Sequence, residues 1–211
     1  MTTLYGLPGA ASLAPHILLE EAGADYAFVR PVREGSDRGP AEFFAASPGG
    51  RVPVLVEGDV ALTESAAICM HIADRRPAAR LAPAVGDPER SNWYRWLVYL
   101  TNTVQPALYE LLYPERYVSD VGEAPGLRRA ADRRLADEWD ALDAELGGRY
   151  YLVGDAYTAA DAYLWMLARW SRHQDVPAFR RPNLRAHWER VAARPAVARV
   201  QEQEALAPVA L

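Results

Sequence analysis

Lysine is absent from this chain of 211 residues, in which all 23 basic residues are arginine. Without lysine the chain can form neither a lysine Schiff base nor the phosphate-binding lysine of a Walker A loop. Cysteine is nearly absent as well, because Cys69 is the only one, and a disulfide within the chain is therefore excluded. Cys69 stands in an apolar helical run, where we expect it to be a small buried hydrophobe.

Other signals are missing in ways that narrow the class of protein. No apolar run approaches the ~18 residues that span a bilayer, and the start of the chain lacks the pattern of a signal peptide. We therefore expect no membrane partner and a cytoplasmic location, which a single cysteine also suits. The net charge of −5 argues against nucleic acid as a partner. The four histidines show no metal-ligand spacing and have no cysteine partners, so no metal site is expected.

The first third of the chain alternates short strands with helices. A polar loop from about Pro31 to Pro40 separates the second strand from a short helix, and Glu57-Gly58-Asp59 has the turn chemistry of a hairpin. The order is strand, helix, strand, helix, two strands and helix: Leu4–Gly6, Ser12–Gly23, Tyr26–Val29, Glu42–Ser47, Val54–Val56, Val60–Leu62 and Glu64–Arg75. This order predicts a thioredoxin-like domain over residues 1–77, followed by a linker over 78–88.

Beyond Pro88 helical patterns replace the strands. Core stripes are expected at Trp93, Trp96, Leu97 and Leu100 and again at Leu135, Trp139, Leu142 and Leu146. Pro106 should bend or interrupt its helix, and Thr158 with Asp161 forms a capping box before an apolar run. Two further amphipathic helices are expected over Asn183–Ala193 and Pro195–Glu204. Residues 89–211 are therefore predicted to form an all-α domain, so the fold class is α/β plus all-α.

The most informative motifs are Val52-Pro53 and Glu64-Ser65. Pro53 stands where a strand begins, since proline cannot donate to a sheet ladder. If the bond between Val52 and Pro53 is cis, the backbone N–H and C=O of Val52 are exposed to a peptide-like ligand. Glu64-Ser65 opens a helix whose free N–H groups can hold a carboxylate. Each motif alone has an ordinary structural explanation, but together they predict a site for a small acidic peptide.

Four motifs in order make the chain resemble the glutathione transferase family, most closely its bacterial beta class. They are Leu7–His16, Arg51–Leu55, Thr63–Ile68 and Thr158–Tyr163. The resemblance covers essentially the whole chain. It implies a thioredoxin-like domain, a helical domain, a homodimer and a role in detoxification. It also implies that the bond to Pro53 is cis, that Val52 pairs through its backbone with the cysteinyl unit of glutathione, and that Glu64 and Ser65 hold the γ-glutamyl group.

The first loop departs from the family pattern. Ala11 replaces the beta-class cysteine, and it is not the serine of other classes either. Ser12 is the nearest hydroxyl, and with the helix N-terminus behind it could lower the pKa of the glutathione thiol, so it is the leading candidate for the catalytic residue. A plain N-cap is the competing interpretation. Tyr5 is the weaker catalytic candidate, because a strand tyrosine activates the thiol in some classes.

Two further groups of residues are expected to hold ligands. Arg51 could pair with the glycyl carboxylate of glutathione, because guanidinium geometry suits a carboxylate; a solvated surface arginine is the alternative. An apolar electrophile would bind between the domains, at a wall with one cation. That wall would be made by Tyr109, Tyr113, Arg116 and Trp165, for which ordinary core and surface roles are the alternative.

The leading hypothesis is therefore a glutathione S-transferase that directs the glutathione thiolate, its co-substrate, to an electrophilic small molecule. Because position 11 lacks cysteine, a mixed-disulfide cycle is not expected from that site. Gln105 and Pro106 stand where beta-class members carry a histidine and a lysine, which further disfavours thiol-transfer chemistry. Two alternatives stay open: a non-catalytic binding or dimerisation module of the same fold, and a specialised glutathione-dependent isomerase or dehalogenase.

Overall fold

The computed structural model describes residues 1–31 and 40–209, so most of the predicted polar loop at 31–40 lies outside the described residues. The chain divides into two compact units. The first combines Met1–Ala84 with Ala193–Pro208, and the second is built on Val85–Ala192. The C-terminal helix therefore folds with the N-terminal unit, whereas the sequence had assigned residues 89–211 to one domain.

The first unit is built on a four-stranded sheet in the order β2-β1-β3-β4. Its strands are β1 (Thr2–Tyr5), β2 (Tyr26–Val29), β3 (Val54–Glu57) and β4 (Val60–Leu62). β1 pairs in parallel with β2 and antiparallel with β3, and β3 and β4 form the predicted hairpin. The predicted strand and helix order of a thioredoxin-like domain is confirmed.

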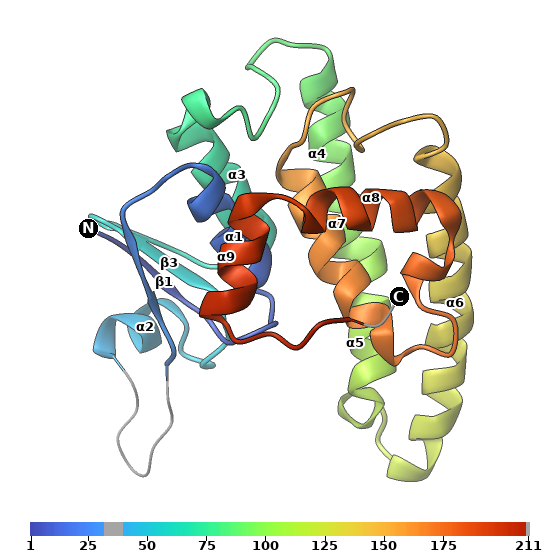
Figure 1. Cartoon of the computed structure of the whole chain (residues 1–211). Coiled ribbons are helices and arrows are strands. Elements are labelled where there is room, and N and C mark those ends of the chain that lie inside the picture. Colours follow the sequence, from blue (N-terminus) through green and yellow to red (C-terminus); the bar gives the residue numbers. More distant parts are fainter. Residues whose placement is uncertain (32–39, 210–211) are drawn as a thin grey trace. The chain divides into compact units, whose positions relative to one another are not determined.

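Helices cover both faces of this sheet (Figure 1). They are α1 (Leu13–Glu21), α2 (Ala41–Ala46), α3 (Ser65–Arg75) and α9 (Pro195–Gln203). α1 and α3 lie on one face and α2 on the other, while α9 lies beside α1. Cys69 is fully buried in α3, as its apolar surroundings predicted, and burial raises the pKa of its thiol.

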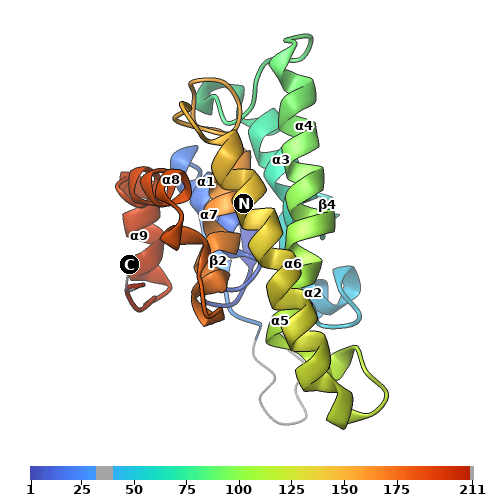
Figure 2. The same cartoon turned by 90° about the vertical axis from the view of Figure 1, so that its right-hand side faces the viewer.

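The second unit is entirely helical in its described residues. Its helices are α4 (Glu89–Tyr99), α5 (Gln105–Leu112), α6 (Ala124–Glu145), α7 (Ala159–Trp170) and α8 (Pro182–Ala192). α6 runs beside α4 and α5 in both views (Figures 1 and 2). The predicted stripes on α4 and α6 are buried, as expected of core residues. None of the helices that the structure describes is long and apolar enough to cross a bilayer.

Pro106 interrupts the path from α4 to α5 as predicted. The five residues Leu100–Val104 form a π-helical turn, in which the Gln105 N–H donates to the Leu100 carbonyl. Proline has no N–H for an α-helical bond, and its ring clashes with the carbonyl four residues earlier. A wider turn just before the proline removes that conflict.

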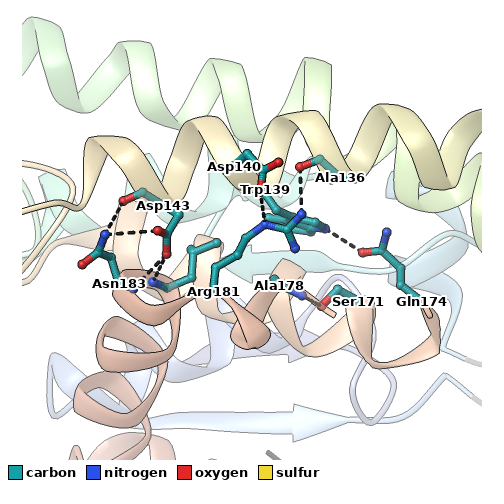
Figure 3. A network of polar contacts seen from close by, with 10 residues as sticks. Ala136, Trp139, Asp140, Asp143, Ser171, Gln174, Ala178, Arg181 and Asn183 are labelled. Atoms are coloured by element: carbon teal, nitrogen blue, oxygen red, sulfur yellow. Dashed lines mark hydrogen bonds and ion pairs between the residues drawn. The ribbon is translucent and has the colours of Figure 1, made fainter. Parts of the chain in front are cut away.

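Two acidic residues hold the second unit together through backbone N–H groups. Asp161 completes the predicted capping box with Thr158 at the start of α7, and it also accepts from His187 Nε2 at 2.9 Å. Asp143 on α6 caps α8, because its Oδ1 accepts from the N–H groups of Asn183 at 2.8 Å and Leu184 at 2.9 Å (Figure 3). The first-turn donors of α8 are thus satisfied by another helix.

A second polar network joins α6 to the segment between α7 and α8 (Figure 3). The Trp139 indole N–H donates to Gln174 Oε1 at 2.6 Å, and Arg181 donates to Asp140 Oδ1 at 2.5 Å and to the Ala136 carbonyl at 3.0 Å. These bonds place side chains of α6 opposite the turn that leads into α8. These hydrogen bonds give the polar groups of Trp139, Gln174 and Arg181 a role in the packing of this unit.

Glu57 lies at the end of the sheet where β1 begins, since Thr2 and Glu57 are partners in register. Its carboxylate accepts from His71 Nε2 at 2.9 Å, Arg76 Nη2 at 2.6 Å and Thr2 Oγ1 at 3.0 Å. Burial raises the pKa of Glu57, but the bonds from His71, Arg76 and Thr2 and the charge of Arg76 outweigh it and lower the pKa to about 2. This cluster ties α3 to the sheet.

The Glu57 cluster should make the stability of the protein depend on acid pH. Because its folded-state pKa lies below the unfolded value of about 4.3, the stabilisation is present above that pH and is lost as the pH falls towards 2. We expect Glu57→Gln to remove about 1–2 kcal/mol of the pH-dependent part of the free energy of unfolding, a figure already reduced for the partial exposure of Glu57. Urea unfolding at several pH values measures this change. Glu189→Gln, at an exposed pair with Arg185, is the matched control. Equal slopes for wild type and Glu57→Gln would contradict this expectation.

Candidate active site

Strand register brings three segments of the first unit to one end of the sheet. Tyr5, the last residue of β1, pairs with Val54, the first residue of β3. Leu55 pairs with Leu62, so the start of β3 lies next to the end of β4. The loop after β1, the Val52-Pro53 bond before β3 and the start of α3 after β4 therefore share this end. These are the segments that the sequence had singled out.

The Val52-Pro53 peptide bond is cis, as the resemblance implied. Within the described residues, the N–H and C=O of Val52 have no hydrogen-bond partner. The backbone just before it is fixed, because Ser47 Oγ accepts from the Arg51 N–H and donates to the Arg51 carbonyl, both at 3.0 Å. Val52 thus presents two unpaired backbone groups from a fixed turn, while the Arg51 side chain is exposed.

Glu64 and Ser65 stand at the start of α3. Glu64 has a φ of 66° and a ψ of 111°, a strained conformation for a residue with a side chain, and such strain is concentrated at ligand sites. The first bond of the helix runs from the Ile68 N–H to the Glu64 carbonyl, which leaves the preceding N–H groups directed out of the helix end. In the described part of the chain, the Ser65 hydroxyl has no partner. Carboxylate-binding groups are therefore gathered here.

The Ser12 side chain takes part in the hydrogen bonds of the first loop. Its side chain is fully buried, and its Oγ accepts from the Leu7 N–H and donates to the Leu7 carbonyl, both at 3.1 Å. Ser12 stands at the N-cap position of α1 but makes no side-chain capping bond, so the plain N-cap interpretation is not met either. In this arrangement the hydroxyl closes the loop on Leu7, and the catalytic role of Ser12 stays a prediction.

Tyr5 likewise serves the fold in this structure. Its ring is buried against Phe43 of α2, with centroids 5.5 Å apart, and its hydroxyl donates to Glu42. Burial, this hydrogen bond and the charge of Glu42 raise the pKa of Tyr5 to about 12. The tyrosine therefore attaches α2 to the sheet, which is the packing role that the sequence left as its alternative.

A buried contact that the sequence did not indicate supports the loop before α1. Glu204, at the end of α9, accepts from the Gly9 N–H through Oε2 at 2.7 Å and bonds His16 Nδ1 through Oε1 at 2.7 Å. Both side chains are fully covered, and the His16 ring stacks on Phe28 at 4.3 Å between centroids. The carboxylate of Glu204 thus fixes the loop that carries Ala11.

Three of the four residues predicted for an electrophile site lie together in the second unit. Tyr109 and Tyr113 have ring centroids 6.4 Å apart, and the Arg116 guanidinium lies 4.2 Å from the centroid of Tyr113. Trp165 differs, because it is fully buried and stacks on Trp188 at 4.7 Å. Its indole belongs to the helical core, so it offers no surface to a ligand. The binding role of the other three stays a prediction.

Among the described residues, no group of three or more histidine, cysteine, aspartate or glutamate side chains could hold a metal ion. The candidate site is instead made of backbone groups, one free hydroxyl and an exposed arginine. Such donors suit a peptide that carries carboxylates.

The fold is that of a thioredoxin-like protein with an added helical unit. The site lies at one end of the sheet, where the donor groups suit a peptide ligand. Residues 1–74 match the family model for the N-terminal domain of glutathione S-transferase, and residues 116–195 match the model for its C-terminal domain. Glutathione S-transferase GST-4.5 from Xanthomonas campestris is 30% identical over 90% of this chain and 92% of its own length. The chain belongs to the glutathione S-transferase family, whose members are transferases.

Solved structures agree in fold. A sphingomonad glutathione S-transferase complexed with glutathione is 35% identical, with a TM-score of 0.83 over 97% of this chain and 100% of that one. A bacterial beta class enzyme from Sphingomonas chungbukensis is 34% identical, with the same TM-score and coverage. These likenesses confirm the predicted family and the predicted fold class.

Proposed function

We propose that this protein binds glutathione at the end of its sheet and transfers the glutathione thiolate to an electrophilic carbon. The Val52 backbone would pair with the cysteinyl unit, as one strand pairs with another. Glu64 and Ser65, with the N-terminus of α3, would hold the γ-glutamyl group, and Arg51 would pair with the glycyl carboxylate. A cytoplasmic location, which the lone buried cysteine suits, is part of this proposal.

The observation that carries the proposal is that two sets of backbone groups without partners, those of Val52 and those at the start of α3, lie at the same end of the sheet. Val52 keeps its N–H and C=O unpaired within the described chain, and α3 begins there with a strained Glu64. Buried or half-buried backbone groups are normally paired, and strain of this kind costs roughly 1–3 kcal/mol. A scaffold without a ligand has no need of either feature.

Thiolate formation would rest on the N-terminus of α1 rather than on a side-chain hydroxyl. The N–H groups of Ala11 and Ser12 have no acceptor in the part of the chain that the structure describes, and they stand at the positive end of the helix. In the reaction the thiol loses its proton to solvent and the sulfur attacks the electrophilic carbon. A carbon–sulfur bond then forms as the leaving group departs with its electron pair. Positioning supplies most of the acceleration.

The proposal is tested by calorimetric titration of glutathione into the wild-type protein and Ser65→Ala. We expect the wild type to bind and Ser65→Ala to bind about tenfold more weakly, because a hydrogen bond to a charged group is lost. Ser91→Ala, an exposed serine on α4, is the matched control and should bind as the wild type does. Absence of glutathione binding by the folded wild type would overturn the proposal.

One observation favours a second function, a non-catalytic glutathione-binding module: Ala11 offers no side chain, and the Ser12 hydroxyl is bonded inside the loop. The ultraviolet absorbance of bound thiolate separates the two. A transferase should lower the pKa of the bound thiol below its free value of about 8.5, whereas a binding module need not. An isomerase or dehalogenase would share the glutathione site and differ in the electrophile that it accepts.

A homodimer is also part of the proposal. α4 carries Tyr94 and Val98, which are four residues apart and therefore share a helix face. Their side chains are 43% and 51% exposed. Exposed apolar side chains grouped in this way suit a contact with a second copy of the chain.

A further inference from the structure

The segment between α7 and α8 runs alongside α6, and polar bonds join the two at successive positions. Near the start of α8, Asp143 of α6 accepts from the Asn183 N–H at 2.8 Å. Arg181 bonds α6 at the next position back along the segment (Figure 3). Further back, Gln174 Nε2 donates to Asp132 Oδ1 at 2.9 Å. At each of these positions a donor of the segment meets an acceptor of α6.

The next position along this interface brings positive charges together instead. Arg128 lies one helical turn before Asp132, about 6 Å away along the axis of α6, and on the same face. On the other side, Arg172 and His173 directly precede Gln174. Because Gln174 is bonded to Asp132, these three basic residues lie at the same level of the unit. We name Arg128, Arg172 and His173 the basic cluster.

The charges within the basic cluster act on one another. Burial lowers the pKa of His173 below its ordinary value, and the charges of Arg172 and Arg128 lower it further. An effect of Arg128 on the imidazole agrees with the position that the polar bonds give to this arginine. His173 is therefore largely uncharged at neutral pH, because a third positive charge is unfavourable there.

The basic cluster has no counter-ion within residues 1–31 and 40–209, where none of its members forms an ion pair. Asp132 bonds Gln174 instead, and Asp175, the next acidic residue along the segment, pairs with no member of the cluster in those ranges. All three side chains of the cluster are exposed, so a solute can reach them.

Arg172 is also held in place by the end of α7. Its Nη1 donates to the Arg169 carbonyl in the last turn of that helix at 2.9 Å. A guanidinium carries five N–H groups, so this bond fixes the group and leaves other donors for an anion. The interface thus offers donors from two elements at a position where it lacks an acceptor.

We propose that the basic cluster binds a tetrahedral dianion, a phosphate group that is either free or carried by a small molecule. Three donor groups from two elements can surround such an anion, whereas a planar carboxylate is satisfied by one guanidinium fork. The anion supplies the missing acceptor and favours the protonated form of His173. This site lies within the helical unit, so the inference does not depend on the proposed binding of glutathione.

The test follows the His173 ring by NMR while sodium sulfate replaces sodium chloride at constant ionic strength. Sulfate stays a dianion over the range of about pH 5 to 8 in which histidine titrates, so only the protein changes its charge. We expect saturating sulfate to raise the pKa of His173 by about 1, which corresponds to about tenfold tighter binding of sulfate to the protonated form. His173→Gln identifies the resonance.

Two variants test the arginines of the basic cluster. We expect Arg128→Gln and Arg172→Gln each to weaken sulfate binding about tenfold, because a charge-assisted hydrogen bond is lost. Arg172→Gln also removes a bond at the end of α7, whereas the Arg128 side chain forms no hydrogen bond in the described chain, so Arg128→Gln should fold normally. Arg133→Gln is the matched control, because it removes an equal exposed charge about 140° round α6 from Arg128.

Inorganic phosphate and adenosine monophosphate, compared at the same pH, distinguish the two sources of the anion. Tighter binding of the nucleotide would indicate a phosphate carried by a small molecule, and tighter binding of inorganic phosphate would indicate the free ion. The proposal is overturned if sulfate leaves the pKa of His173 unchanged, or if Arg133→Gln weakens binding as much as Arg128→Gln does. Arg128→Gln should bind glutathione as the wild type does, so this inference and the proposed function can fail separately.

Discussion

Replacing Glu204 with alanine is expected to lower the free energy of unfolding by about 3–5 kcal/mol. The side chain is fully buried, and both of its oxygens are used, one by the Gly9 N–H and one by His16 Nδ1. Alanine removes the acceptor of both bonds, one of them from the fully buried His16, and opens a cavity as well. Urea unfolding followed by circular dichroism measures the loss.

Two further variants show which part of this loss belongs to the contact. Glu204→Gln keeps one acceptor oxygen but turns an amide towards a donor, so we expect an intermediate loss of roughly 1–3 kcal/mol. His16→Phe keeps a ring to stack on Phe28 and removes the bond to Glu204. The double variant with Glu204→Gln and His16→Phe completes a double-mutant cycle, which isolates the coupling free energy between the two side chains. Additive losses in that cycle would show that Glu204 and His16 do not act together.

The same contact links the end of the chain to the candidate active site. Gly9 lies in the loop that carries Ala11, so Glu204→Ala should weaken glutathione binding even under conditions where the variant is fully folded. Arg194 and Arg199 attach α9 to α1 through Glu21 and Glu20, which keeps Glu204 in place. This explains why α9 folds with the first unit although it follows the helical unit in sequence.

Much of the fold could be predicted because its signals are local. Alternation and turn residues specified the β3–β4 hairpin, and the spacing of Leu135, Trp139 and Leu142 specified the buried face of α6. Thr158 and Asp161 specified where α7 begins. Each of these patterns spans a few residues, over which strand and helix periodicity act directly.

The roles of single side chains could not be predicted in the same way. Ser12 stood at a helix start and suggested a free hydroxyl, but whether its Oγ bonds Leu7 or a ligand depends on the shape of one loop. Tyr5 bonds Glu42, which is 37 residues away in the sequence, and His16 bonds Glu204, which is 188 residues away. Contacts of that range follow from packing, which residue spacing does not encode. By contrast, the prediction at Val52-Pro53 concerned the backbone. Proline restricts the backbone directly, so its effect there can be predicted from the sequence.

Gly6→Ala is the second substitution from which we expect a large effect, a loss of stability of about 3 kcal/mol or more. A Cβ at Gly6 would lie 2.5 Å from both Cβ and Oγ of Ser12 and 2.6 Å from Cε2 of Phe28. None of these atoms can move away cheaply. Ser12 is bonded on both sides to Leu7, the Phe28 ring is stacked on His16, and Gly6 itself donates to the Val29 carbonyl at 3.0 Å.

The controls for this substitution come from the same chain. A Cβ at Gly49 would meet no atom within 4 Å, so Gly49→Ala should have nearly the stability of the wild type. In Gly6→Ala combined with Ser12→Gly, two of the three clashes disappear, and part of the lost stability should return. If Gly6→Ala unfolds at the wild-type urea concentration, the loop is not held as rigidly as its bonds indicate. A third outcome is that Gly6→Ala is destabilised and that Gly6→Ala with Ser12→Gly regains stability but does not bind glutathione. In that case Ser12 supports ligand binding by shaping the loop, because the bonds of its hydroxyl fix the position of Ala11.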